Sequence, residues 1–163
     1  MEAPHKMIAL VDSLNSLGLT KKNKDAIILA HKKVAISYLN EENYVDAKSH
    51  FSDVLNYSPS DSIAQYNILM IDAHLLKQTG NRQKLWDAIE FYYKAQRFHP
   101  NNGEPYFFIG KAYQSLDNND FDLIIESYQK ALELELSDSL KNEVEKEMLS
   151  LLARKKKLKD FWK

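Results

Sequence analysis

The chain of 163 residues has no cysteine, only four glycines and four prolines, and no apolar run long enough to cross a bilayer. The missing cysteine excludes disulfides, thiolate metal sites and cysteine nucleophiles. So few helix breakers favour long helices over many strands and tight turns.

We predict a cytoplasmic protein. The alternative is an exported or periplasmic one whose signal peptide has been removed from this sequence.

The chain also lacks an excess of charge of either sign. Its net charge is −1, which gives no global reason to expect nucleic-acid binding. The C-terminal segment is the local exception, because six cations against Asp160 give it +5 and leave −6 for the rest. These cations can stabilise the C-terminal end of a helix through its dipole. They can also contact an anionic surface, and the candidates are Arg154, Lys155, Lys156, Lys157 and Lys159.

Patterns that carry catalysis are missing too. Gly110-Lys111 fails as a phosphate-binding loop, because Pro105 stands where its first glycine belongs and Ala112 where serine or threonine belongs. Close helix packing explains Gly110 better. No two of the five histidines are three or four residues apart, the spacing that places ligands on one helical face. We therefore predict no enzyme activity, no cofactor and no metal site.

Apolar residues recur at helical spacing along the whole chain. Pro59 and Pro100 end helices, since proline lacks the N–H that an inner helical position needs. The pattern predicts eight helices, at 7–17, 20–39, 44–57, 63–78, 84–98, 104–116, 120–135 and 139–159.

The inner helices repeat a pattern of small and aromatic residues. The first copy consists of Tyr38, Ala47, Phe51, Val54 and Pro59. The second copy has Ala88, Tyr92, Ala95 and Pro100. A looser third copy has Tyr106, Ile109, Gly110, Tyr113, Tyr128 and Ala131. A period of about 34 residues is typical of stacked helix pairs, in which small residues let helices approach and aromatics fill the gap to the next pair.

On these residues the stretch 28–138 resembles the tetratricopeptide repeat (TPR) family. The resemblance implies an all-α, right-handed TPR-like helical-hairpin solenoid with an N-terminal helix and a C-terminal capping helix. We expect a single domain spanning 1–163. Its parts are 1–27, the repeats 28–61, 62–102 (extended) and 103–138, and the cap with its basic tail at 139–163.

The third repeat departs from the family pattern at two positions. Ile124 replaces a small alanine, and Leu136 stands where proline is usual. We therefore expect the last hairpin to be splayed, with a second helix that runs on longer.

In this family the first helix of each pair lines a concave groove that binds a partner. The resemblance implies a groove formed by Leu29, Lys32, Ile36, Asn40, Ile63, Tyr66, Asn67, Met70, His74, Phe107, Phe108 and Lys111. Aromatic residues and methionine are common interface anchors. The alternative for each is packing between neighbouring helices.

One TPR subfamily grips the C-terminal carboxylate of heat-shock chaperones. Lys32 and Asn67 fit that clamp, but Ile36, Glu104 and Phe108 occupy its other positions and cannot hold a carboxylate. We predict instead a non-catalytic module that binds a peptide or helix of another protein, as an adaptor or scaffold. The alternatives are a secretion or assembly chaperone, since the chain is similar in length and repeat number to translocator chaperones of bacterial type III secretion, and a self-associating scaffold.

Overall fold

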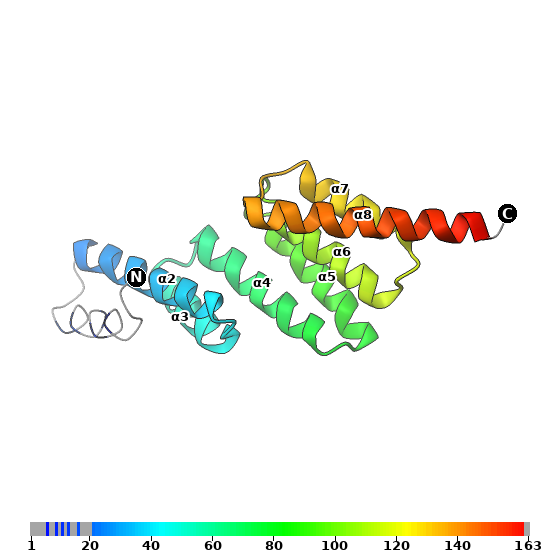
Figure 1. Cartoon of the computed structure of the whole chain (residues 1–163). Helices are drawn as coiled ribbons and strands as arrows, with labels where there is room; N and C mark the ends of the chain where they lie inside the picture. Colours follow the sequence, from blue (N-terminus) through cyan, green and yellow to red (C-terminus); the bar gives the residue numbers. More distant parts are fainter. Residues whose placement is uncertain are drawn as a thin grey trace. The chain divides into compact units, whose positions relative to one another are not determined.

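The computed structural model describes Lys6, Ala9, Val11, Ser13, Ser16 and residues 21–161. Within these residues the chain is helical and has no strand (Figure 1). The helices are α2 (Lys21–Asn40), α3 (Tyr44–Tyr57), α4 (Ser62–Gln78), α5 (Arg82–Gln96), α6 (Glu104–Leu116), α7 (Phe121–Leu132) and α8 (Asp138–Phe161). No helix of this described part is long and apolar enough to span a membrane.

The chain divides into two compact units, Met1–Ile71 and Asp72–Lys163, with the division inside α4. Each is described separately below, as unit 1 and unit 2. The single domain predicted from the sequence stays a prediction.

Unit 1 is built on the hairpin of α2 and α3. The turn between the two helices passes through Glu42, which has a φ of 56°, and Asn43 caps α3 by accepting a hydrogen bond from the Asp46 backbone N–H at 3.3 Å. Ala47, Phe51 and Val54 form the buried face of α3. The repeat pattern therefore correctly identified the residues that hold this hairpin together.

The predicted helix 7–17 falls mostly outside the described residues. Ala9, Val11, Ser13 and Ser16 are described, and all four are helical. Val11 is buried in a cluster with Ile27 and Ala30 of α2, and Tyr57 packs against it. The end of this predicted helix and the start of the next lie outside the described part.

Unit 2 contains the end of α4 and the four helices that follow. Gly80 adopts a φ of +65° after α4, and Asn81 caps α5 by accepting from the N–H groups of Gln83 and Lys84. This cap starts α5 two residues before the predicted boundary at 84.

Close contact between α6 and α7 depends on Gly110. A Cβ at this position would overlap the ring of Tyr128, which is fully buried on α7. The expectation that Gly110 serves helix packing is therefore confirmed. The contact shows how a small residue lets these two helices approach closely.

The prediction that α7 runs on longer was wrong. α7 ends at Leu132, three residues before the predicted end at 135. Glu135 donates its N–H to the Asn101 carbonyl at 2.7 Å, and its own carbonyl accepts from Gly103 at 2.9 Å. These bonds form an isolated parallel bridge to the α5–α6 loop, so the backbone of Glu135 is engaged outside the helix.

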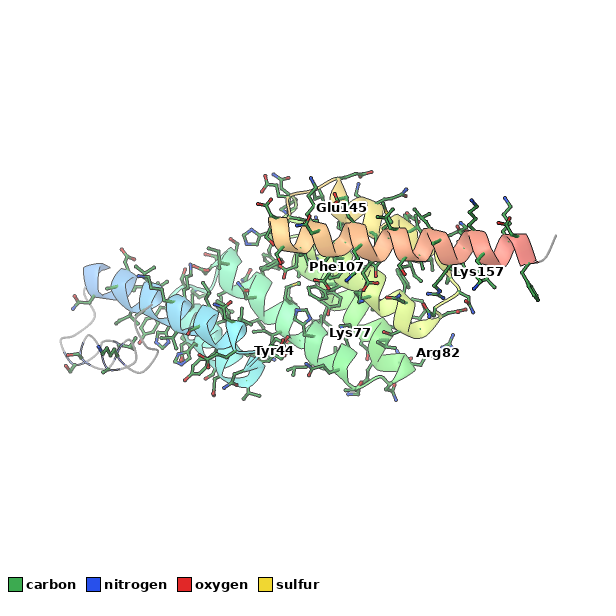
Figure 2. All side chains as sticks on the ribbon, viewed as in Figure 1. Tyr44, Lys77, Arg82, Phe107, Glu145 and Lys157 are labelled. Atoms are coloured by element: carbon green, nitrogen blue, oxygen red, sulfur yellow. The ribbon has the colours of Figure 1, made fainter. Side chains whose placement is uncertain are left out.

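α8 closes unit 2 as the predicted capping helix. Its buried residues Val144 and Leu151 join a cluster with Phe107, Ile124 and Tyr128. Figure 2 shows Phe107 on α6, and Glu145 and Lys157 on α8. The cluster draws on α6, α7 and α8, so α8 is part of the core of unit 2.

Candidate functional site

The predicted groove residues of α2 lie on its exposed face. Leu29 and Ile36 are 54% and 47% exposed, and Asn40 is exposed as well. Leu29 and Ile36 are seven residues apart, about two helical turns, so they share one stripe of the helix. Ile27 and Val34, on the other side, are fully buried.

Lys32 lies between Leu29 and Ile36 along this stripe and joins α2 to the start of α4. Its Nζ is 2.6 Å from Oδ2 of Asp61, whose Oδ1 accepts from the Ala64 N–H at 3.0 Å. Burial raises the pKa of Asp61, but Lys32 and the N–H groups of Ala64 and Ile63 outweigh it and hold that pKa below its ordinary value. Asp61 is therefore a charged cap that fixes the first turn of α4 beside α2.

Ile63 lies in that first turn and is 42% exposed. Leu29, Ile36 and Ile63 are named here the apolar patch of unit 1. All three come from helices that the TPR resemblance assigns to the partner-binding face. The Lys32–Asp61 ion pair crosses between their two helices.

The other predicted residues of α4 in unit 1 offer less surface. Tyr66 and Met70 are buried, and the Asn67 side chain donates to the Ile63 carbonyl at 2.8 Å. Lys32 is paired to Asp61, so of the two residues that fit the clamp one is already engaged by a carboxylate of the chain itself.

In unit 2 the predicted groove residues pack largely against one another. Phe107 is buried in the core cluster, and Phe108 meets His74 edge-on with ring centroids 4.4 Å apart. Nδ1 of His74 lies 2.8 Å from the Tyr92 hydroxyl. Burial, with repulsion from Lys77, lowers the pKa of His74 to about 4, so its imidazole is neutral at pH 7.

Lys111 is engaged as well. Its Nζ lies 2.8 Å from Oε1 of Glu147 on α8. Burial and the charge of Lys111 lower the pKa of nearby Lys77. The predicted residues of unit 2 therefore make packing and pairing contacts of the kind that the sequence analysis gave as the alternative.

The basic residues of α8 divide into two groups. Arg154 donates to the Asn118 side chain at 2.7 Å and to its carbonyl at 2.9 Å, and Lys155 pairs with Asp122 at 2.6 Å. These two residues fasten α8 to the α6–α7 turn and to α7. Lys156, Lys157 and Lys159 are exposed, as is Phe161 at the end of the helix.

The sequence pattern missed one group of residues with ligand chemistry. His31 on α2 lies next to His50 and Asp53 on α3. The spacing of histidines along one helix cannot identify a pair of histidines that lie on two different helices. The available signal was the hairpin itself, since His31 and His50 lie at similar distances along the chain from the turn at Glu41–Glu42.

Comparison with known proteins gives a fold and no family. No family model matches the chain, and no curated protein matches it. Among solved structures it is similar to MamA 41-end from Desulfovibrio magneticus RS-1, with 17% identity and a TM-score of 0.53 over 96% of this chain and 87% of that one. The MamA RS-1 ArsTM double mutant gives the same identity and TM-score over 96% and 86%. The fold is thus all-α, a TPR-like helical solenoid.

Proposed function

We propose that this protein is a non-catalytic binding module, an adaptor or scaffold, and that a peptide or helix of another protein docks on the apolar patch of unit 1. One observation carries the proposal. Leu29, Ile36 and Ile63 are half exposed, while the opposite faces of the same helices are buried. Large aliphatic side chains held on rigid helices lose little freedom on binding, which favours them as contacts.

The patch also defines what the partner presents. Covering an aliphatic side chain of this size completely is worth about 1.5–3 kcal/mol, so three partly covered ones support a modest affinity. The partner therefore needs apolar side chains at helical or alternate spacing. Asn40 and the Lys32–Asp61 pair supply a polar rim, where backbone groups of a peptide can bond.

Tyr66, Met70 and Phe107 have a different role in this proposal. As buried residues they hold their helices in place and contribute little contact area. The longer groove that also includes His74, Phe108 and Lys111 stays a prediction.

Site-specific photo-cross-linking tests the proposal. A photoreactive phenylalanine analogue replaces Ile36 in one variant and Val45 in a control, because Val45 is 72% exposed on α3 of the same unit. We expect a discrete protein partner to cross-link from position 36 and not from position 45. Equal cross-linking from both positions would contradict the assignment of this face.

The identity of the captured protein separates the alternatives. A second copy of the same chain indicates a self-associating scaffold. A client that becomes insoluble when expressed without this protein indicates a chaperone. A partner that stays soluble alone supports an adaptor.

A further inference from the structure

Three potential ligand atoms converge between the two helices of unit 1. Nδ1 of His31 lies 3.0 Å from Nδ1 of His50 and 3.5 Å from Oδ2 of Asp53. Nδ1 of His50 lies 3.9 Å from the same oxygen. Two imidazoles and a carboxylate thus approach one another through one atom each. These three atoms surround one small volume.

These distances suit the corners of a metal coordination sphere. Nitrogen and oxygen ligands at about 2.0–2.2 Å from a tetrahedral ion are separated from one another by about 3.3–3.6 Å. Of the three observed separations, 3.0 Å lies below that range, 3.5 Å lies within it and 3.9 Å lies above it. An ion at the centre therefore requires side-chain movements of only a few tenths of an ångström.

The secondary structure holds the three side chains in this arrangement. His50 and Asp53 are three residues apart on α3 and so lie on one face of it. Between them in sequence, Phe51 is fully buried and anchors that turn of the helix. The Tyr38 ring stacks on His50 with centroids 5.7 Å apart, and Tyr57 lies against His31 at 6.3 Å.

Both a hydrogen bond and a metal ion are compatible with these short contacts. One hydrogen shared between the two Nδ1 atoms satisfies the 3.0 Å contact. A cation at the centre would accept lone pairs from all three atoms. His31 is buried, whereas the Asp53 side chain is 40% exposed, so an ion can enter from the carboxylate side.

We propose that His31, His50 and Asp53 bind one divalent transition-metal ion of the Zn²⁺ type, with a fourth position open to water or another ligand. Imidazole and carboxylate ligands suit Zn²⁺ and Co²⁺. The ion joins α2 to α3 and stabilises unit 1. This site is separate from the apolar patch, so its test does not depend on the proposed function.

The test is a titration of the chelator-treated full chain with Zn²⁺, in which calorimetry measures the binding. We expect one ion per chain, a micromolar or lower Kd, and a higher Tm with the metal bound. Co²⁺ in place of Zn²⁺ should give the visible absorption of a tetrahedral complex. Ring-nitrogen NMR should show metal at Nδ1 of both histidines.

Matched variants make the result specific. His50→Gln and Asp53→Asn should each weaken Zn²⁺ binding at least tenfold, while His99→Gln, which removes an imidazole outside the cluster, should leave it unchanged. Asp53→Asn is close to isosteric at a half-exposed position, so it keeps the test valid if His50→Gln folds poorly. Absence of stoichiometric binding, or unchanged binding in Asp53→Asn, overturns the proposal.

Discussion

At the scale of single residues, small side chains and buried polar groups determine how the helices meet. Gly110 leaves room for the Tyr128 ring, and Gly103 leaves room for the Ala131 carbonyl oxygen. His74 is held neutral within an aromatic group that includes Tyr92 and Phe108. Substitutions at Gly110 and at His74 therefore have specific expected effects.

Gly110→Ala should destabilise the protein by about 1–3 kcal/mol, because the added methyl group overlaps the buried Tyr128 ring and forces α6 and α7 apart. Chemical denaturation measures the change in unfolding free energy. Ser115→Ala, at an exposed position of the same helix, should stay within about 0.5 kcal/mol of wild type. Equal stability of Gly110→Ala and wild type would show that the contact is not tight.

His74 should make the protein less stable in acid. Its pKa is lowered from 6.5 to about 4, so below pH 6.5 the unfolded chain gains a proton that the folded protein does not accept until about pH 4. Stability is therefore lost as pH falls from 6.5 to 4, by on the order of 3 kcal/mol in total.

His74→Asn isolates this effect, since an amide can replace Nδ1 as the partner of the Tyr92 hydroxyl without titrating. The unfolding free energies of wild type and His74→Asn are measured from pH 7 to pH 4. Over this range wild type should lose more stability than His74→Asn. Parallel pH profiles for the two proteins would contradict the buried neutral imidazole.

At the scale of elements, sequence periodicity and capping residues predict the helices well where the signals are local. The bounds of α3 and α6 match the predicted ranges, because Asn43 and Pro105 mark their starts and Ser58 and Asp117 follow their ends. The end of α7 was missed because a backbone bridge to Asn101 and Gly103 determines it, and that contact is remote in sequence. The same limit explains why the His31–His50 pair was missed.

Leu151 and Leu149 form a matched pair on α8. Leu151 is buried in the core of unit 2, whereas Leu149 is 67% exposed. Leu151→Ala should cost about 2–5 kcal/mol and Leu149→Ala less than about 0.5 kcal/mol, measured by denaturant unfolding. Similar costs for the two would mean that α8 does not pack as a capping helix.

At the scale of the whole molecule, the repeat pattern predicts the fold but does not identify the surface that binds a partner. Small and aromatic residues at repeat spacing predicted a TPR-like solenoid, and the likeness to MamA agrees with it. Several predicted groove residues proved to be buried, among them Tyr66, Met70 and Phe107. Periodicity places a residue on a face of its helix, while burial depends on what packs against that face.

The central proposal is that the apolar patch of unit 1 binds a partner. The most direct test is the Kd of the cross-linked partner segment, as a synthetic peptide, for wild type, for Leu29→Ser/Ile36→Ser and for the control Val45→Ser. Both variant proteins change only exposed positions, so their stability should stay near that of wild type. We predict a Kd at least tenfold weaker for the double variant and unchanged for the control. Equal affinity in all three proteins would contradict the account.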